Sequence, residues 1–574
     1  MDNFFTDNSD IQLIFDSTNL KEIIDLKEGD YSEAGKYDHA FTDADDAKEG
    51  YRDVLTLIGE ITAQEIAPLA PDVDEQGAIF DAGSVCYAEG IQKDMEILQR
   101  SNLMGLTLPR QYGGLNFPTY VYTIAIEMVS QADASLMNLF GLQDIGDTIC
   151  EFADEEIKAR YLPLFSSGKV TGAMALTEPD AGSDLQAVQL KAILDPSDNT
   201  WYLNGVKRFI TNGCGDVLLV LARSEPGTKD GRGLSMFVCE SDDSLVVRRI
   251  ENKLGIHGSP TCELQFNNTK AYLIGKRRMG LIRYVMALMN GARLGIAAQG
   301  LGIAQASYLE GLDYAKAREQ FGQAIINFPL VYSMLVNSRV DIEAARLLTY
   351  ETARAVDLKK GYENLLHHAE NPDKELKVRA KHYNSLAAML TPMAKYLSTE
   401  YANDVAYKSL QIHGGTGYMK DFNVERHCRD ARITNIYEGT TQLQYVAAIG
   451  GVVTRVWEPE LDRLEAKHTE AFQKPYLKEL KDKRALLNKA IDFVKEKNDH
   501  EYQSYYQDRL VDMVTKLYTA HLFLKYAAFS DEKKKTMDIF LEREIPEWEK
   551  NFEAVTSGKS RVIEESSSLL DLSR

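Results

Sequence analysis

The chain has little cysteine: six of its 574 residues, with no C-x-x-C pair among them. The cysteines are scattered along the chain, at Cys86, Cys150, Cys214, Cys239, Cys262 and Cys428. This spacing argues against a disulfide framework or a thiolate metal site, so we expect reduced, mostly packed thiols in a cytoplasmic protein. His367 and His368 are adjacent rather than on one helical face, and nothing nearby completes a ligand set, so we expect no metal.

Long apolar runs and an excess of positive charge are also missing. The run VLLVLA, residues 217–222, is only strand-sized, so we expect no membrane span. The first residues, MDNFFTDNSD, are acidic and lack the basic region of a secretory signal or transit peptide. The formal net charge of −21 argues against non-specific binding to nucleic acid or to an anionic membrane.

The remaining composition is that of a globular protein of several parts. Apolar residues make up 44% and charged residues 26%, and the length exceeds what one hydrophobic core usually organises. Changes in composition and in the periodicity of apolar residues predict five segments. They are an acidic N-terminal extension outside the core (1–50), a helical N-terminal domain (51–170), a middle β domain (171–280), a C-terminal four-helix-bundle domain (281–455) and a helical C-terminal extension (456–574).

Short apolar runs predict the middle β domain. The segment TWYLNGVKRFITNGCGDVLLVLARS, residues 200–224, contains two such runs around Asn204-Gly205, a preferred hairpin turn. LSMFVCES, SLVVRRIEN, CELQFNN and AYLIG follow as further short strands. We therefore expect a small β-barrel or sandwich.

Helical periodicity marks the segments on either side. The stretch 283–322 is helical in pattern but rich in glycine, which costs about 1 kcal/mol each in a helix, so we expect its glycines to permit close helix packing. The last segment carries two apolar stripes at helical spacing, formed by Leu487, Ile491 and Val494 and by Leu510, Met513, Val514 and Leu517. Such stripes predict amphipathic helices packed on the body or on a second subunit. We expect DEKKK, 531–535, to be a solvated helix start.

One carboxylate stands out in ITNIYEGTTQLQ, residues 433–444. Glu438 lies between Tyr437 and Gly439, with apolar residues upstream, and the glycine permits close approach of a backbone or a ligand. Thr441 and Gln444 have the spacing of a capping box, so a helix is expected to begin just after the glutamate. Backbone N–H groups at such a start could serve an oxyanion or a phosphate. The pattern indicates a carboxylate at the mouth of a site.

Four groups of motifs, taken together and in this order, resemble the acyl-CoA dehydrogenase family. They are MALTEPDAGSDL (174–185) with KRFITNG (207–213), RLGIAAQGLGIAQ (293–305) with AREQFGQ (317–323), QIHGGTGYMKD (411–421), and IYEGTTQ (436–442). The resemblance covers roughly 60–455 of the chain. It implies an α+β fold with a helical N-terminal domain, a central β-barrel domain and a C-terminal four-helix bundle, here with extra C-terminal helices as in larger family members.

The resemblance implies FAD-dependent α,β-dehydrogenation of an acyl-CoA thioester. Glu438 matches the family's base, which removes the proton next to the thioester, while flavin N5 accepts hydride from the next carbon. Apolar surroundings should raise the pKa of Glu438 once substrate excludes water. Some relatives carry the base instead on the long helix, shortly before the arginine matching Arg293; there Gly291 has no side chain that could act. On its own, Glu438 could equally be a helix-start carboxylate favoured by the dipole.

The resemblance also implies the cofactor contacts. Residues expected at the flavin ring and pyrophosphate are Met174, Leu176, Thr177, Gly182 and Ser183, with Phe209, Ile210 and Thr211 on the other side of the ring. Many relatives have Trp where this chain has Phe209. Phenylalanine keeps the aromatic face for stacking but lacks the indole N–H. Residues expected at the pyrophosphate across a subunit interface are Arg318, Gln320 and Phe321, and those expected at the adenosine end are Gln411, Gly414, Gly415, Thr440 and Gln442.

Substrate and partners are implied less fully. The expected substrate contacts are Ser183, Asn290, Arg293, Tyr437 and Gly439, and SLMNLFGLQD (135–144) should help to shape the acyl pocket. Because relatives share FAD sites between protomers, we expect a homodimer or a dimer of dimers, passing electrons to an electron-transferring flavoprotein. Three alternatives stay open: a 3-methylthiopropanoyl-CoA dehydrogenase, an acyl-CoA oxidase, and a non-catalytic, nucleic-acid-associated branch, against which the net charge weighs.

Overall fold

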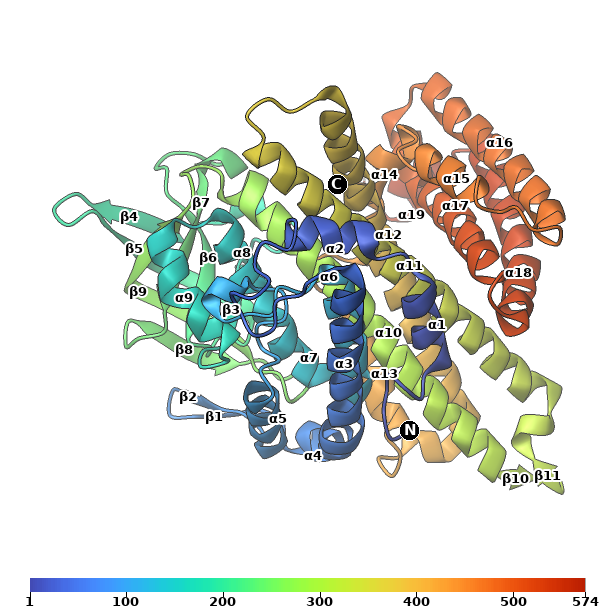
Figure 1. Ribbon diagram of the computed structural model, residues 1–574, viewed down its shortest axis with the longest axis horizontal. Coiled ribbons are helices and arrows are strands. Elements are labelled where there is room, and N and C mark those ends of the chain that lie inside the picture. Colours follow the sequence, from blue (N-terminus) through green and yellow to red (C-terminus); the bar gives the residue numbers. More distant parts are fainter. Residues whose placement is uncertain (573–574) are drawn as a thin grey trace.

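Helices form the N-terminal part of the computed structural model, which describes residues 1–572 (Figure 1). They are α1 (Ser9–Ser17), α2 (Lys21–Glu28), α3 (Ala44–Ile61), the π-helix η1 (Thr62–Ile66), η2 (Ala67–Leu69), α4 (Ala70–Gln76), α5 (Glu89–Arg100), η3 (Arg110–Tyr112), α6 (Thr119–Ala132), α7 (Ala134–Phe140), η4 (Gly141–Gln143), α8 (Asp144–Phe152) and α9 (Glu155–Ser166). A short hairpin, β1 (Ile79–Asp81) with β2 (Ser84–Cys86), interrupts them.

The first fifty residues belong to the core, so the expectation that they lie outside it is wrong. Phe5, Ile11 and Phe15 are at most 1% exposed and join the main hydrophobic cluster. Glu28, at the end of α2, forms a buried ion pair with Arg110, whose Nη1 lies 2.7 Å from Oε2. The acidic composition of this segment concealed short apolar clusters that pack against elements distant in sequence.

The middle of the chain is a seven-stranded sheet closed on itself. Its strands are β3 (Gly172–Ala175), β4 (Lys191–Asp195), β5 (Thr200–Thr211), β6 (Val217–Arg223), β7 (Leu234–Glu240), β8 (Leu245–Ile250) and β9 (Thr261–Ile274), with the short helices η5 (Leu185–Ala187) and η6 (Gly231–Gly233) in the connections. The order is β3-β6-β4-β5-β9-β7, with β8 on β9, and pairing of β6 with β7 completes the barrel. Alternate residues of the strands fill a core inside it.

The predicted hairpin turn at Asn204-Gly205 is wrong. Strand β5 runs straight through these residues, and the register against β9 shifts between Leu203 and Asn204, as in a β-bulge. Gly205 has φ +142°, which explains the glycine, and the side chain of Asn204 bonds Asn268 across the strands. The bulge uses the same residue types as a tight turn because both need an unusual backbone conformation.

Long helices form the C-terminal half. They are η7 (Gly280–Val285), α10 (Met286–Ala317), η8 (Ile325–Asn327), α11 (Pro329–His368), α12 (Lys374–His413), η9 (Gly414–Tyr418), α13 (Val424–Thr434) and α14 (Thr441–Val453), with the hairpin β10 (Glu319–Gln320) and β11 (Gln323–Ala324) after α10. Helix α10 packs against α6, α11 and α12. The expected close packing of its glycines holds: a Cβ on Gly302 would lie 2.3 Å from the carbonyl oxygen of Glu127 on α6.

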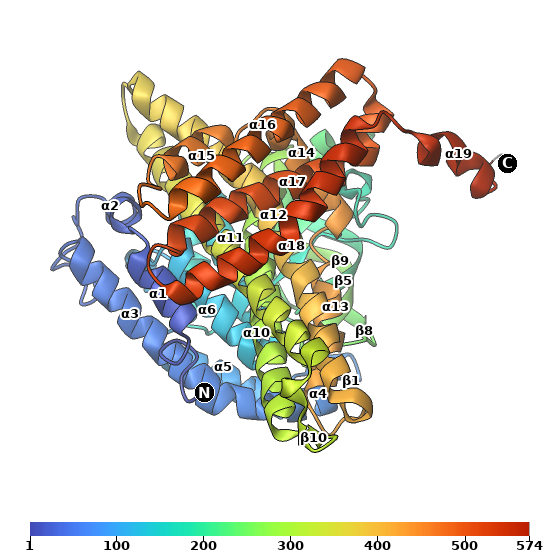
Figure 2. The ribbon, with the colours of Figure 1, turned by 90° about the vertical axis from the view of Figure 1, so that its right-hand side faces the viewer.

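The C-terminal extension packs on the body of the same chain. It comprises α15 (Glu458–Glu465), α16 (Gln473–Lys497), α17 (His500–Tyr526), α18 (Asp531–Thr556) and α19 (Arg561–Leu569). Both predicted apolar stripes are buried; one lies on α16 and the other on α17. Helix α17 packs against α11 and α14, α18 packs against α11, and α16 packs on α17 and α18. Only α19 has no buried residue, and it projects from the molecule (Figure 2).

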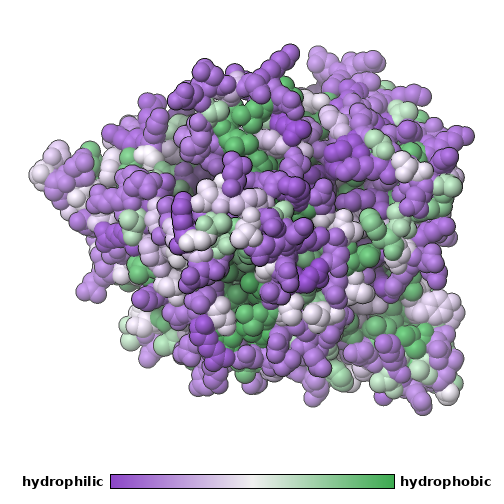
Figure 3. All heavy atoms as spheres, in the orientation of Figure 1, coloured by the Kyte–Doolittle hydropathy of each residue, from purple (hydrophilic) through white to green (hydrophobic). Residues whose placement is uncertain are grey.

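The helix start at DEKKK is confirmed, but its solvation is only partial. Helix α18 begins at Asp531. Lys533 is 3% exposed, and its Nζ lies 2.7 Å from Asp10 and 3.1 Å from Glu343, so it ties the extension to α1 and α11. Polar side chains cover most of the face seen in Figure 3, with small apolar groups between them. Within residues 1–572, no helix is long and apolar enough to cross a membrane, and no three metal-ligating side chains cluster.

Candidate active site

Glu438 lies in a short loop between α13 and α14, residues 435–440, which we term the base loop. Its backbone is left-handed, with φ 54°, and Gly439 follows with φ 96°. A residue other than glycine rarely adopts this conformation unless surrounding contacts hold it. Glu438 as a residue is partly exposed. Burial raises the pKa of Glu438, although the positive charges of Arg293 and Lys395 act to lower it.

Side chains from three helices hold the base loop through its carbonyls. Arg293 on α10 points Nε at the Glu438 carbonyl oxygen at 3.5 Å. Lys395 on α12 donates from Nζ to the Gly439 carbonyl oxygen at 2.8 Å, and Gln444 on α14 donates to the same oxygen at 2.7 Å. Lys395 was not predicted, because a lysine in a helical pattern is usually a surface residue.

The predicted helix start after Glu438 is confirmed, since α14 begins at Thr441. The capping box is wrong: Thr440 is the N-cap and its side chain makes no capping hydrogen bond. The hydroxyl of Thr441 donates to the Glu400 carboxylate instead, while Gln444 turns back to the base loop. The spacing was right, but tertiary partners attract both side chains.

Tyr437 faces away from solvent toward two polar side chains. Its hydroxyl donates to Oε1 of Gln299 on α10 and lies 3.3 Å from Oδ1 of Asn138 on α7. Burial raises the pKa of Tyr437. This predicted substrate residue therefore has protein partners, and its backbone rather than its hydroxyl borders the site.

A second carboxylate stands beside the start of α10. Asn290 and Arg293, both predicted, bond each other, with Arg293 Nη1 3.3 Å from Asn290 Oδ1. On the same turn, a Cβ on Gly291 would lie 3.4 Å from Oδ2 of Asp144, the first residue of α8. Burial and neighbouring charges, including Asp147 and Glu438, raise the pKa of Asp144 to about 7. Asp144 is the last residue of the segment expected to shape the acyl pocket.

A buried ion pair brings the two predicted flavin-ring segments together. Lys207 is fully buried, and its Nζ lies 2.9 Å from Oε1 of Glu178 and 2.8 Å from the carbonyl oxygen of Leu176. The next residue, Arg208, donates its N–H to the Thr177 carbonyl oxygen at 2.9 Å. These contacts join the turn after β3 to the end of β5.

The joined segments leave an accessible surface for a flat ligand. Phe209 has φ 59°, its ring is half exposed, and the Arg208 guanidinium lies 4.6 Å from the ring centre. A Cβ on Gly182 would meet no atom within 4 Å, and Ser183 beside it is exposed. Met174 and Thr211 are partly exposed, while Ile210 supports the surface from the barrel core.

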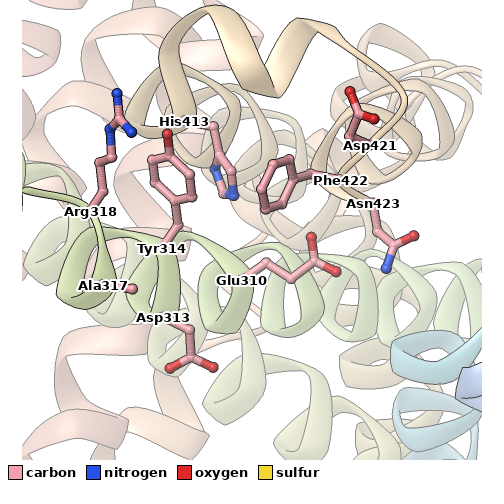
Figure 4. A pocket seen from close by; sticks show the side chains of 9 residues that line it. All are labelled: Glu310, Asp313, Tyr314, Ala317, Arg318, His413, Asp421, Phe422 and Asn423. Carbon is pink, nitrogen blue, oxygen red and sulfur yellow. The ribbon is translucent and has the colours of Figure 1, made fainter.

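Another group of predicted cofactor residues gathers at the far end of α10. Arg318 follows α10 directly and, with Tyr314 and His413, lines a cavity of about 550 Å³ (Figure 4). Tyr314 and His413 stack with ring centres 4.1 Å apart. The predicted residues Gln411, Gly414 and Gly415 flank His413, and all three are exposed. Glu310, Asp313 and Asp421 also line the cavity.

The β10–β11 hairpin places Gln320 and Phe321 beside Arg318. Phe321 has φ 52° and is 93% exposed. Phe321 packs edge-on against Phe328, with ring centres 6.1 Å apart, and Leu330 is 82% exposed. Several exposed apolar side chains near one another are typical of a surface that meets another molecule.

A single chain does not bring the two groups of predicted cofactor residues together. Helix α10 has 32 residues and is therefore about 48 Å long. The barrel and the base loop lie near its start, and Arg318 lies just after its end (Figure 1). Thr440 and Gln442, expected at the adenosine end, lie beside Glu438 rather than beside Gln411.

Comparisons with known proteins identify the family. Models of the acyl-CoA dehydrogenase N-terminal, middle and C-terminal domains match residues 48–169, 173–269 and 282–448. The chain is 35% identical over 431 residues to 3-methylmercaptopropionyl-CoA dehydrogenase of Ruegeria pomeroyi, covering 70% of this chain and 71% of that protein. The chain belongs to the acyl-CoA dehydrogenase family, as predicted, and is an oxidoreductase acting on acyl-CoA.

Solved structures agree with this assignment. Butyryl-CoA dehydrogenase from Megasphaera elsdenii superposes with a TM-score of 0.61 at 29% identity, over 70% of this chain and 98% of that one. An acyl-CoA dehydrogenase complexed with FAD from Bacillus anthracis reaches a TM-score of 0.76 at 23% identity, over 94% of this chain and 93% of that one. At that identity the second likeness speaks for the fold alone, and its coverage includes the C-terminal extension. The predicted fold is confirmed.

The residues at both ends of α10 fit the family's cofactor, FAD. The exposed Phe209 ring and the open space at Gly182 suit an aromatic ring system and its linker. At the other end, Arg318 is an exposed cation suited to a pyrophosphate, and a Cβ on Gly414 or Gly415 would meet no atom within 4 Å. One chain presents these two groups of residues on separate surfaces.

Proposed function

We propose that this protein catalyses the α,β-dehydrogenation of an acyl-CoA thioester to the 2-enoyl-CoA, with FAD as cofactor and an electron-transferring flavoprotein as the acceptor. Glu438 removes the α-proton. The observation that carries the proposal is the base loop, in which a partly buried carboxylate is held in a left-handed conformation by three side chains. When bound, FAD supplies the acceptor for the β-hydride.

The proton affinity of Glu438 suits a base for a weakly acidic carbon. Burial raises the pKa of Glu438, which strengthens it as a base, and the positive charges of Arg293 and Lys395 oppose that rise. Substrate that displaces water from the loop would raise the pKa further. Burial and the two cations therefore act on the pKa of Glu438 in opposite directions.

The backbone of the same loop supplies an electrophilic contact. Within residues 1–572, the Glu438 N–H donates no hydrogen bond to a protein acceptor. A free N–H beside the base can donate to the thioester carbonyl, where negative charge develops as the α-proton leaves. Proton removal and carbonyl polarisation then act on adjacent atoms of one substrate.

The divided cofactor residues favour a homodimer or a dimer of dimers. In this arrangement the turn 174–183 and Phe209 bind the ring end of FAD, and Arg318 with the Gln411 loop of a second copy binds the other end. Phe321 would meet the second copy, which accounts for its exposure.

The substrate we favour has a short acyl group with a polar or thioether atom. The relative from Ruegeria pomeroyi acts, by its name, on 3-methylmercaptopropionyl-CoA. Asp144 makes the space beside Gly291 polar, which suits such a group better than a long straight chain. An acyl-CoA oxidase would use the same residues and would differ only in passing electrons to oxygen.

The proposal is tested by titrating purified protein anaerobically with acyl-CoA thioesters and following the flavin absorbance. The panel runs from short straight chains to branched, cyclic, methylthio and long-chain thioesters. We expect bound flavin, bleached by one group of them and reoxidised by an electron-transferring flavoprotein. Bound flavin that no thioester bleaches would contradict the reaction, and rapid reoxidation by oxygen alone would favour the oxidase.

A further inference from the structure

Lys395 is a buried cation with no carboxylate partner. It lies in the middle of α12 with 0% exposure, and no carboxylate oxygen within residues 1–572 lies within 4.0 Å of its Nζ. Its hydrogen-bond acceptor is the carbonyl of Gly439, one residue after the base. Burying a lysine without a counter-ion is unfavourable, so a lysine retained at such a place calls for a specific reason.

The same helix also holds both ends of the base loop. Glu400, five residues after Lys395, accepts a hydrogen bond from Asn435 Nδ2 at 3.0 Å. It also accepts one from the hydroxyl of Thr441. Glu400 thus ties down the first residue of the loop and the first residue of α14, and Lys395 holds the strained peptide between them.

The held peptide sets the direction of the catalytic side chain. Glu438 has φ 54° and Gly439 has φ 96°. With these positive angles, the Glu438 side chain and the neighbouring backbone carbonyls point in directions that a helix or an extended strand would not give them. The Gly439 carbonyl lies one peptide after Glu438, so a contact that holds that oxygen restrains the backbone on the C-terminal side of Glu438. Gln444 shares the carbonyl but is uncharged.

We propose that Lys395 is a positioning residue for the base: its ammonium holds the Gly439 carbonyl and thereby restrains the left-handed Glu438 beside it. The inference rests on the proposed function of Glu438.

The charges around Lys395 set the pH at which this role changes. Glu438 on the base loop, Arg293 on α10 and Glu400 on α12 are the charged groups that influence it. Burial lowers the pKa of Lys395 to about 7. The lysine is therefore charged below that pH, where it lowers the pKa of Glu438, and loses this influence above it.

The experiment compares Lys395→Met and Lys395→Arg with wild type, all loaded with FAD. Lys253→Met is the matched control, because Lys253 Nζ also donates to a backbone carbonyl, that of Ser259, at 2.8 Å. Two quantities are measured: the rate of anaerobic flavin reduction between pH 6 and pH 9, and the hydrogen exchange of the backbone amides in the base loop.

For Lys395→Met we expect base-loop amides that exchange faster and flavin reduction slowed about 10- to 100-fold. The loss should be largest near pH 6, where the wild-type lysine is charged, and the pH midpoint of reduction should move upward. Lys395→Arg should recover much of the rate, and Lys253→Met should leave the base-loop exchange as in wild type.

The inference is overturned if Lys395→Met reduces its flavin at the wild-type rate with an unmoved pH profile, or if its base-loop exchange is unchanged. Should Lys395→Met not fold, Lys395→Gln and Gln444→Ala provide the comparison: the proposal requires the lysine variant alone to move the pH midpoint. If wild type itself is bleached by no thioester, the proposed function fails, and hydrogen exchange still decides whether Lys395 holds the loop.

Discussion

The carboxylate of Asp144 faces Gly291 across the start of α10, so closely that a Cβ on the glycine would lie 3.4 Å from Oδ2. A larger side chain at position 291 would meet this carboxylate, so the glycine lets Asp144 lie close to the turn of α10 that carries Asn290 and Arg293. Burial and the nearby carboxylates of Asp147 and Glu438 raise the pKa of Asp144 to about 7.

Replacing Asp144 should therefore change the preferred acyl group. Asp144→Leu is expected to raise kcat/KM for straight apolar acyl-CoAs by on the order of tenfold relative to thioether- or hydroxyl-bearing ones. Asp144→Asn, which removes charge but keeps hydrogen bonding, should change the ratio less. The measurement is kcat/KM with matched pairs of acyl-CoAs, and an unchanged ratio in Asp144→Leu would place the acyl group elsewhere.

Asp94 should make the stability of the fold decrease with pH. It is fully buried, neither carboxylate oxygen has a hydrogen-bond partner among residues 1–572, and burial raises the pKa of Asp94 from 3.8 to about 8. Between these values the folded state keeps a proton that the unfolded state releases, so the free energy of unfolding falls by about 1.4 kcal/mol for each pH unit.

Asp94→Asn removes this titration. The free energy of unfolding of the variant minus that of wild type should increase between pH 5 and pH 8, by on the order of 4 kcal/mol. Urea denaturation at the two pH values measures the difference. If the difference in the free energy of unfolding does not grow with pH, the Asp94 carboxylate does not keep its proton in the folded protein, which would contradict the prediction.

The buried pair of Lys207 and Glu178 should support cofactor retention. Lys207→Met leaves the Glu178 carboxylate in the barrel wall with only the N–H groups of Gln189 and Leu190. We expect a loss of about 3–5 kcal/mol in the free energy of unfolding and faster release of FAD, because the turn 174–183 loosens. Lys207→Met with Glu178→Gln should recover part of both, as judged by thermal unfolding and by flavin fluorescence after dialysis. Full FAD retention in the single variant would show that the pair does not shape the site.

The C-terminal extension should be required for a stable body. Deleting 456–574 exposes the faces of α11 and α14 and removes Arg463 and Glu460, which neutralise Glu351 and Arg354 on α11. We expect aggregation or a loss of the dimer on size-exclusion chromatography. Deleting the chain from Arg561 onward, which removes only α19 among the helices, should have little effect. A monodisperse, active protein lacking 456–574 would contradict this packing role.

The sequence predicted the features that local pattern determines. The barrel strands, the glycine-rich α10 and the helix start after Glu438 each follow from periodicity or from turn chemistry within a few residues. Glu438 was picked out as the candidate base from the short motif IYEGTTQ, residues 436–442, which can be recognised without knowing the rest of the fold.

Features that depend on distant partners were missed. Asn204-Gly205 has the chemistry of a turn, yet pairing of β5 with β9 makes it a bulge. Lys533 and Asp10 lie at opposite ends of the chain and meet in the core. Nothing in the sequence around Lys395 indicates its role. The role follows from the packing of α12 against the base loop, where Lys395 donates to the Gly439 carbonyl oxygen.

The central claim is that Glu438 removes the α-proton, and a single-turnover comparison of wild type with Glu438→Gln tests it directly. The amide has nearly the same shape, keeps the loop contacts made through carbonyls, and cannot act as the base. With a thioester that bleaches wild type, the account predicts that Glu438→Gln binds FAD and acyl-CoA normally but reduces its flavin slower by at least about 1000-fold. Flavin reduction by Glu438→Gln within a few-fold of wild type would contradict it.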